Sequence, residues 1–368
     1  MKPNIVLTTI TRVPNYGASL QAYASRQVLE RFGDVTILEY DNPVVRRSRA
    51  LIRSGPSAKN LLSAGKDILR FRSRARLLEK FKTFYDYNLG LSESLTLDQI
   101  QNTKKKIDFC ISGSDQIWNP QCVSDEDKFD DTYFLSFAPQ HSRCIAFSSS
   151  MGGYQCRGSK LVELARLLSR FDAISVREQD TKILLEQILG RSVRHSLDPT
   201  LHLNSSTWSD LVKNFRADVP EDFILAYTVP RLKRLARVSK QVASCLELPI
   251  VSIDGDPFPL VDTRYQINDA GPIDFLELFQ RAKFVVTDSF HGVCFAITYR
   301  LPFLAVTTGP HASRITSLLT MLGLEGRLVR EDSIPNEALK AINYHRVHSR
   351  LIQEREKDIA FLEESIAA

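Results

Sequence analysis

Short runs of β-branched and other apolar residues alternate along the chain with longer segments whose apolar residues recur at helical spacing. Over the first 200 residues, the runs that predict strands are Asn4–Ile10, Val35–Tyr40, Ile107–Ser112, Arg143–Ser148 and Ala173–Val176. Helices are expected at about 19–32, 160–170 and 178–189. Strands that alternate with helices in this way are typical of a parallel sheet in an α/β fold.

The pattern begins again after Asp198-Pro199-Thr200. Further strands are predicted at Phe223–Thr228, Pro249–Ile253, Phe284–Thr287 and Phe303–Val306. Helices are expected at about 232–247, 273–281, 291–300 and 313–322. The length of 368 residues also favours two compact domains. We therefore predict an N-terminal α/β domain over residues 1–200 and a C-terminal one over residues 201–330, each built on a parallel sheet.

The positive charge of the chain is concentrated in one segment. Residues 46–82 hold twelve basic side chains and two acidic ones, Asp67 and Glu79, so this segment carries +10 and the rest of the chain −5. We interpret residues 42–88 as a basic helical insertion in the N-terminal domain. Two hypotheses stay open for it: a solvated helical surface, or a peripheral contact of a basic face with an anionic membrane or a phosphate-bearing acceptor. The net charge of +5 for the whole chain does not favour a nucleic-acid binder.

The remaining features concern the tail and the compartment. Residues 331–368 form a tail with a predicted helix from Asn336 to Ile366, which can cross back to the first domain. No apolar stretch is long enough to span a bilayer, and the first residues lack the features of a secretory signal. The six cysteines are far apart, without a CxxC pair, so neither a zinc site nor a disulfide framework is predicted. We expect a cytoplasmic protein, with any peripheral contact at the inner face of the membrane.

Polar and small residues follow several of the predicted strands. Ligands of open parallel sheets bind beyond the carboxyl ends of the strands, often at helix N-termini, so these junctions are the candidate site. They are Asn15–Ala22, Gly113–Pro120, Ser175–Gln179 and Thr287–Gly292. At the first junction Asn15, Tyr16 and Gly17 are candidate ligand contacts and Ser19 is a candidate helix cap. A plain turn with a cap is the alternative.

The second and third junctions supply charged candidates in the first domain. Ser114, Asp115 and Gln116 follow the most apolar strand of that domain. Arg177 lies where a strand passes into a helix, a position suited to a bidentate grip on a phosphate or a carboxylate. A surface ion pair between Arg177 and Glu178 is the alternative.

The fourth junction places Asp288, Ser289 and His291 at the opening of an apolar helix. The helix dipole disfavours the protonated imidazolium there, which suits a histidine that transfers protons near neutral pH. Cys294 lies in an apolar stretch typical of a core, so Cys–His chemistry is not predicted. The sequence contains no GxSxG elbow, Walker loop or GxGxxG fingerprint, which weakens the cases for a serine hydrolase and for an ATP- or dinucleotide-binding protein.

A set of short strings occurs in a fixed order: NYGASLQAYA, GSDQIWNP, YFLSFAP, AFSSSMG, SVREQ, DPT and TDSFHG. Together they resemble the polysaccharide pyruvyl transferase family from about residue 15 to 324, and GSDQIWNP and TDSFHG are the specific ones. The resemblance implies two Rossmann-like domains with parallel sheets, similar to the B-type glycosyltransferase fold. It also implies phosphoenolpyruvate as donor and a pair of sugar hydroxyls as acceptor. No metal-ligating cluster is apparent, so catalysis without a metal or other cofactor is expected.

The resemblance also gives roles to individual residues. His291 matches the catalytic histidine of the family, and Arg177 matches the arginine of its SxR motif, which is implicated in holding the donor. Arg314 matches more loosely a basic position that follows the histidine. Many members of the wider family read Arg-Leu-His where this chain has Ser289-Phe290-His291. The missing arginine leaves the donor one bidentate partner short, unless Arg314 or another basic residue replaces it.

We therefore expect a pyruvyl transferase that forms a pyruvate ketal on a cell-surface exopolysaccharide or on its lipid-linked precursor. His291 would be the acid–base group, while Asp115 and Asp288 compete for two roles: handling an acceptor hydroxyl and orienting the histidine. The predicted substrate contacts are Arg177, Arg314, Asn15, Tyr16, Gly17, Ser114, Gln116 and Ser289. Two alternatives stay open: a sugar-nucleotide-dependent glycosyltransferase of similar fold, and a non-catalytic binding protein that kept the fold.

Overall fold

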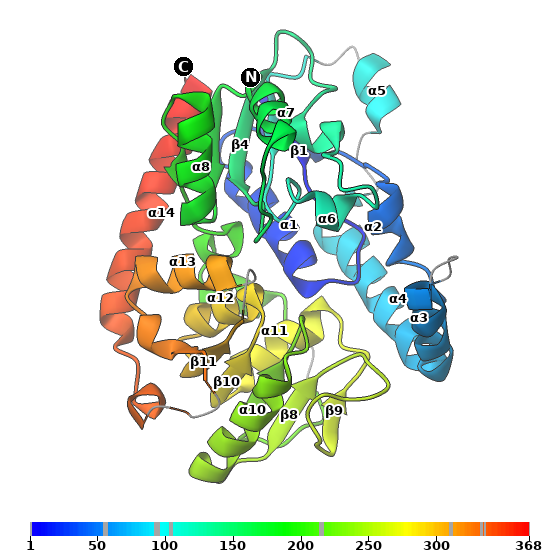
Figure 1. The fold of residues 1–368 in the computed structure, drawn as a ribbon, viewed down its shortest axis with the longest axis vertical. Coiled ribbons are helices and arrows are strands. Elements are labelled where there is room, and N and C mark those ends of the chain that lie inside the picture. Colours follow the sequence, from blue (N-terminus) through cyan, green and yellow to red (C-terminus); the bar gives the residue numbers. More distant parts are fainter. Residues whose placement is uncertain are drawn as a thin grey trace. The chain divides into compact units, whose positions relative to one another are not determined.

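The computed structural model describes residues 2–53, 58–91, 96–102, 106–212, 217–308, 312–331, 334 and 336–367. By their contacts the residues divide into two compact units (Figure 1). Unit 1 comprises Met1–Arg46, Tyr85–His202 and Ser349–Ala368. Unit 2 comprises Arg47–Phe84 and Leu203–His348.

Unit 1 is built on a six-stranded parallel sheet with the strand order β2-β1-β3-β4-β5-β6. Its strands are β1 (Asn4–Thr8), β2 (Asp34–Ile37), β3 (Phe109–Ser112), β4 (Arg143–Ser149), β5 (Ala173–Val176) and β6 (Arg194–His195). Its helices are α1 (Tyr16–Leu29), α5 (Leu97–Asn102), α6 (Pro120–Val123), α7 (Ser159–Leu168) and α8 (Gln179–Leu189), with most of α2 (Pro43–Arg47) and of α14 (Tyr344–Ala367). The central strand β3 is buried at every position, which explains the apolar density of its sequence.

Unit 2 is built on a second six-stranded parallel sheet, with the order β12-β11-β10-β7-β8-β9. Its strands are β7 (Ile224–Tyr227), β8 (Ile250–Ile253), β9 (Tyr265–Ile267), β10 (Phe284–Thr287), β11 (Phe303–Val306) and β12 (Leu328–Val329). Its helices are α3 (Ala58–Leu69), α9 (Ser205–Asp210), α10 (Lys233–Leu246), α11 (Pro272–Arg281), α12 (Phe290–Thr298) and α13 (Ala312–Leu322), with most of α4 (Phe71–Asn88). Its core contains a cluster of aromatic rings that pack against one another: Tyr227, Phe275, Phe279 and Phe295.

The predicted α/β fold class with two parallel sheets is confirmed. Each strand predicted from the sequence is present in the structure, most with bounds shifted by one to three residues at an end. The strands that were not predicted are β6, β9 and β12, and each lies at the edge of its sheet. They contain two or three residues, too few for a periodic pattern of apolar positions to be recognised.

The basic segment has a different place from the one predicted, since its contacts group residues 47–84 with unit 2. Lys66 Nζ lies 2.7 Å from Asp256 Oδ2, and Lys80 Nζ lies 3.1 Å from Asp274 Oδ2. Because both carboxylates lie far along the chain, the local charge pattern could not indicate these ion pairs. The boundary between the units otherwise falls at His202, close to the predicted break.

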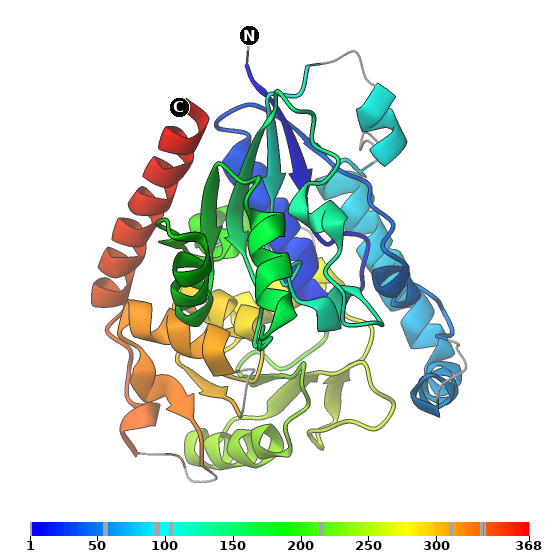
Figure 2. The ribbon, with the colours of Figure 1, turned by 45° about the horizontal axis from the view of Figure 1, so that its top comes forward.

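The C-terminal helix α14 is attached to unit 1 through its second half. Asp358, which is fully buried, accepts hydrogen bonds from Arg194 Nε at 3.0 Å and from the backbone nitrogen of Leu197 at 2.9 Å. These contacts hold the helix beside the edge strand β6 (Figures 1 and 2, red). Among the described residues, no helix is both long and apolar enough to cross a bilayer.

Candidate functional site

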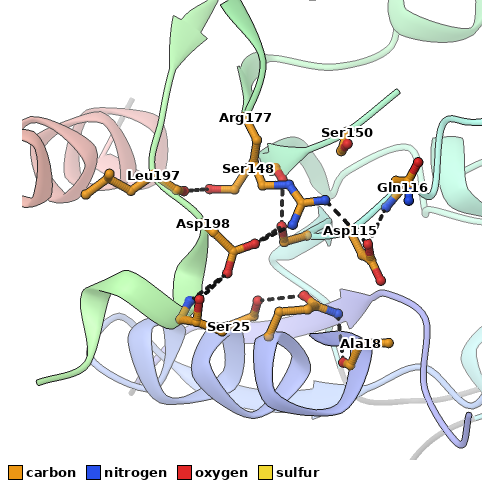
Figure 3. A network of polar contacts seen from close by, with 12 residues as sticks. Ala18, Ser25, Asp115, Gln116, Ser148, Ser150, Arg177, Leu197 and Asp198 are labelled. Atoms are coloured by element: carbon orange, nitrogen blue, oxygen red, sulfur yellow. Dashed lines mark hydrogen bonds and ion pairs between the residues drawn. The ribbon is translucent and has the colours of Figure 1, made fainter. Parts of the chain in front are cut away.

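The carboxyl ends of several strands of unit 1 lead into one group of buried polar residues (Figure 3). Strand β3 continues into Ser114 and Asp115, strand β5 into Arg177, and the chain after β6 reaches Asp198. Because the strands are parallel, these ends lie at the same edge of the sheet, where ligands of such folds bind.

Arg177 lies at the centre of this group. Its side chain is 1% exposed, its Nη1 is paired with Asp198 Oδ2, and its Nη2 lies 3.4 Å from Asp115 Oδ1. Burial works to lower the pKa of Arg177, but the charges of Asp198, Asp115 and Glu178 outweigh it and raise that pKa above its ordinary value. The guanidinium is thus charged, and carboxylates of the protein itself balance its charge. The predicted contact of Arg177 with a donor anion stays a prediction.

Asp198 is not among the site residues predicted from the sequence. It accepts hydrogen bonds from the backbone nitrogen of Thr200 at 2.9 Å and from Thr200 Oγ1 at 2.6 Å, in addition to its ion pair with Arg177. Its only sequence signal is the string DPT. Because β6 has just two residues, no predicted strand marked Asp198 as a strand-end residue.

The string GSDQIWNP has two parts, and the first, Gly113 to Gln116, forms the turn that carries the candidate ligand contacts. Gly113 has a φ of 130°, and a Cβ there would lie 2.1 Å from the carbonyl oxygen of Phe147, so a glycine is required. Ser114 Oγ donates to the carbonyl oxygen of Ser148 at 2.7 Å. Asp115 has a φ of 73° and an 11% exposed side chain, and it accepts a hydrogen bond from the backbone nitrogen of Gln116 at 2.8 Å.

The second part of this string is structural. Trp118 is fully buried and stacks on Phe134 with 5.4 Å between ring centroids. Asn119 caps helix α6 by accepting a hydrogen bond from the backbone nitrogen of Gln121, and Pro120 is the first residue of that helix. The candidate ligand contacts of this junction are therefore Ser114, Asp115 and Gln116.

At the first junction the predicted cap is wrong. Helix α1 begins at Tyr16, and Asn15 caps it, because Asn15 Oδ1 accepts a hydrogen bond from the backbone nitrogen of Ala18 at 3.2 Å. Ser19 lies inside the helix and donates from Oγ to the Tyr85 hydroxyl at 2.8 Å. Tyr16 and Gly17 occupy the first turn of the helix.

In unit 2 the string TDSFHG joins β10 to α12. Ser289 caps the helix by accepting a hydrogen bond from the backbone nitrogen of Gly292 at 3.3 Å. A Cβ on Gly292 would lie 2.3 Å from Thr287 Oγ1, so the close turn requires a glycine there. His291 occupies the first turn of α12 and is 7% exposed.

Asp288, in the same turn, binds the loop that follows strand β7. Its carboxylate accepts hydrogen bonds from Thr228 Oγ1 and the backbone nitrogen of Val229, both at 2.7 Å, and from the backbone nitrogen of Leu232 at 3.1 Å. Burial raises the pKa of Asp288 above its ordinary range, although these hydrogen bonds work to lower it. The carboxylate therefore fixes the loop that connects β7 to α10.

Phe290 links the histidine to a cation. Its ring centroid lies 5.2 Å from that of His291, and the guanidinium carbon of Arg314 lies 5.8 Å from the same Phe290 centroid. The second distance is within the range of a cation–π interaction. Unit 2 therefore carries an imidazole and a guanidinium around one aromatic ring.

The sequence-predicted residues thus form two groups, one in each unit. Unit 1 holds Asn15, Tyr16, Gly17, Ser114, Asp115, Gln116 and Arg177, and unit 2 holds Asp288, Ser289, His291 and Arg314. Within the described part of the chain, no three His, Cys, Asp or Glu side chains gather in a way that could hold a metal ion.

The family model described as "Polysaccharide pyruvyl transferase" matches residues 15–310, which is most of the chain and includes nearly all residues of both groups. The chain belongs to the polysaccharide pyruvyl transferase family. The resemblance noted from the strings is thereby confirmed, and the family is one of transferases that act in polysaccharide biosynthesis. Arg314 lies four residues beyond the matched segment.

Solved structures similar to this pyruvyl transferase family member include an epimerase and a glycosyltransferase. UDP-N-acetylglucosamine 2-epimerase from Rickettsia bellii has 9% identity and a TM-score of 0.49 over 100% of this chain and 97% of its own. The glycosyltransferase SnogD from Streptomyces nogalater has 12% identity and a TM-score of 0.46 over 98% of this chain and 95% of its own. At these identities the likeness concerns the fold alone. No curated protein sequence matches the chain at a significant level.

Proposed function

We propose that this protein transfers the enolpyruvyl group of phosphoenolpyruvate to two hydroxyls of one sugar, forming a pyruvate ketal on a cell-surface polysaccharide or its lipid-linked precursor. Within the transferase family, the observation that carries the proposal is the first turn of α12. There His291 follows the carboxyl end of β10, and the Arg314 guanidinium lies over the ring of the adjacent Phe290.

The reaction sets clear requirements for the site. A proton is added to the methylene carbon of the donor, so positive charge develops on the carbon that bears the phosphate. One sugar hydroxyl adds to this carbon, phosphate leaves, and the second hydroxyl completes the ketal. Of the two hydroxyl protons, one balances the proton given to the methylene carbon and the other leaves with phosphate. The site therefore needs an acid–base group, cations for the donor and a group that orients a hydroxyl.

Unit 2 offers the first two of these groups. His291 is proposed to give the proton to the methylene carbon and to accept protons from the hydroxyls. Arg314 is proposed to bind an anionic group of the donor and to replace the arginine that is missing at Ser289. Because the Ser289 hydroxyl caps α12, Ser289 supports the position of His291 as well as being a candidate contact.

Unit 1 offers the hydroxyl-orienting group. Asp115 is proposed for this role because its side chain is more accessible than that of Asp198, 11% against 0% exposed, and because it lies on a left-handed turn that its contact with Arg177 helps to hold. Asp288 is less suited to it, since its oxygens hold the β7–α10 loop. Arg177 would bind the donor only if a donor anion replaced Asp115 at 3.4 Å, so we assign it first a positioning role. Asn15, Tyr16, Gly17, Ser114 and Gln116 complete the proposed contacts.

The test is phosphate release from phosphoenolpyruvate across a panel of lipid-diphosphate-linked oligosaccharides. We expect His291→Gln to lower kcat by about 10²- to 10⁴-fold, since it removes the proton-transfer group. Arg314→Gln should raise the KM for phosphoenolpyruvate by about ten- to a hundredfold, the loss expected for a hydrogen bond to a charged group.

Matched controls are the exposed residues His345→Gln and Arg346→Gln of α14, which should keep wild-type rates. If His291→Gln and Arg314→Gln both kept full turnover, the assignment of the site would be wrong within a correct family. If no acceptor supported phosphate release while a nucleoside diphosphate raised Tm and phosphoenolpyruvate did not, a sugar-nucleotide-dependent glycosyltransferase would replace the proposal.

A further inference from the structure

Helix α3 and the first turn of α4 show an inverted distribution of polar and apolar residues. The large apolar side chains there are exposed: Leu62 by 66%, Ile68 by 62%, Leu69 by 68% and Phe71 by 45%. Asp67, on the same helix α3, is fully buried. A surface helix of a globular protein normally turns its apolar face to the core. We call Leu62, Ile68, Leu69 and Phe71 the apolar corner.

Ion pairs hold α3 in this orientation. Asp67 Oδ2 accepts hydrogen bonds from the backbone nitrogen and Nε of Arg53, both at 2.9 Å, and Asp67 Oδ1 accepts from Arg70 Nη2 at 3.0 Å. Arg74, whose side chain is 5% exposed, lies 3.7 Å from the same carboxylate. Burial works to raise the pKa of Asp67, but the arginines outweigh it and lower that pKa to about 2.

These ion pairs prevent the apolar corner from turning inward. Rotating α3 to bury its leucines would remove Asp67 from three arginines and Lys66 from Asp256. Because Asp67 is fully buried, separating its carboxylate from these arginines is strongly unfavourable. The exposure of the apolar corner is therefore built into unit 2, and exposed apolar side chains that gather in this way mark interaction surfaces.

Positive charge adjoins the apolar corner. A hollow of about 510 Å³ is lined by Ile68, Leu69, Arg70, Phe71, Arg72, Ser73 and Arg76. Arg72 and Arg76 are exposed at this hollow, and Arg76 is paired with Asp269. The acidic residues of the segment 46–82 are Asp67, which is buried, and Glu79. The surface around the apolar corner thus combines large apolar side chains with arginines.

We propose that the apolar corner inserts into the interface of an anionic lipid bilayer, with the exposed Arg72 at the level of the headgroups. Apolar side chains with flanking arginines are the composition of helices that lie in such interfaces. The arginines that line the hollow complement anionic lipid but repel those of a second copy of the chain, which disfavours self-association through this face.

This inference changes the hypothesis of a basic membrane-binding face. Several cations of the segment are used within the protein: Arg53, Arg70 and Arg74 around Asp67, Lys66 with Asp256, Arg76 with Asp269, and Lys80 with Asp274. Leucine, isoleucine and phenylalanine side chains therefore carry most of the contact, and arginines guide it. The inference does not depend on the proposed reaction, because lipid binding is measured without substrate.

The test is cosedimentation of the full chain with vesicles of phosphatidylcholine alone or with about 30 mol% phosphatidylglycerol. Wild type should bind the anionic vesicles, and about 0.5 M salt should weaken this binding without abolishing it. The triple variant Leu62→Ser/Ile68→Ser/Leu69→Ser should lower the partition coefficient at least about tenfold. Arg72→Gln should lower it about fivefold. Val162→Ser, at a 73% exposed apolar position of α7 in unit 1, is the matched control and should bind as wild type does.

Several outcomes would overturn the proposal. It fails if wild type binds neither vesicle, or if the triple variant binds as well as wild type. It also fails if light scattering shows that wild type is a dimer and the triple variant a monomer, while wild type does not bind vesicles. In that case a second copy of the chain covers the apolar corner. The proposal likewise fails if the apolar corner binds another protein at a fixed stoichiometry and does not bind lipid. Circular dichroism checks the fold of the triple variant, and Leu62→Ser alone keeps the test decisive if that fold is lost.

Discussion

Replacing Asp198 by asparagine removes one of the carboxylates that balance the buried charge of Arg177. The amide oxygen can still accept the hydrogen bonds from the backbone and hydroxyl of Thr200. The amide nitrogen would then face Arg177 Nη1, so two donors would meet where an ion pair was. The variant therefore tests the charge of the group with little change in its shape.

The expected loss of stability follows from the burial of both partners. Side chains of Arg177 and Asp198 are 1% and 0% exposed, and removing one partner of such a pair costs roughly 3–5 kcal/mol. The negative charges of Asp115 and Glu178 still stabilise the Arg177 guanidinium in the variant. We therefore expect a loss of stability at the lower end of this range, about 3 kcal/mol.

The two tryptophans of the chain allow each unit to be followed separately. Trp118 is buried in unit 1 and Trp208 in unit 2, so Trp208→Phe leaves a fluorescent reporter in unit 1 alone. In that background, a loss of about 3 kcal/mol moves the urea midpoint down by about 1 M.

The matched control changes a carboxylate to an amide on the surface of the same unit. Glu126→Gln removes an exposed ion pair with Lys128 and should leave the midpoint unchanged. If Asp198→Asn also unfolded at the wild-type midpoint, the charge of Arg177 would not depend on Asp198, and our account of unit 1 would be refuted.

Two further predictions concern buried carboxylates. The pKa of Asp67 is lowered from 3.8 to about 2 in the folded protein, so its stabilising contribution is present above about pH 4 and lost as the pH falls towards 2. The stability difference between wild type and Asp67→Asn should therefore narrow over that range, measured by Trp208 fluorescence in a Trp118→Phe background; a constant difference would contradict it. Asp358→Ala should destabilise unit 1 by about 3 kcal/mol, the lower end for a buried ion pair because Arg194 is 25% exposed, since it leaves Arg194 and the Leu197 nitrogen without this carboxylate. Trypsin should then cleave α14 faster than in wild type, and unchanged cleavage would argue against this anchor.

Local sequence was sufficient for the elements that carry their own signal. Strands of four or more residues with dense apolar content, such as β3 and β10, were all predicted, and the strings that mark the family were recognised. The turn of TDSFHG is likewise local, because the Ser289 cap and the glycine at 292 satisfy requirements that lie within six residues.

Interactions between distant residues were beyond the reach of sequence patterns. Asp198 was recognised only as part of a string, because its partner Arg177 lies 21 positions away, and Asp115, which contacts the same guanidinium, lies 83 positions away. The inverted orientation of α3 depends in part on Asp256, nearly two hundred residues further along the chain. The amino-acid sequence by itself determined the α/β class, the family and the candidate chemistry, because periodicity and short motifs are local properties. The tertiary structure decided which charges are balanced inside the protein and which apolar side chains remain exposed, because ion pairing and burial depend on which distant segments meet.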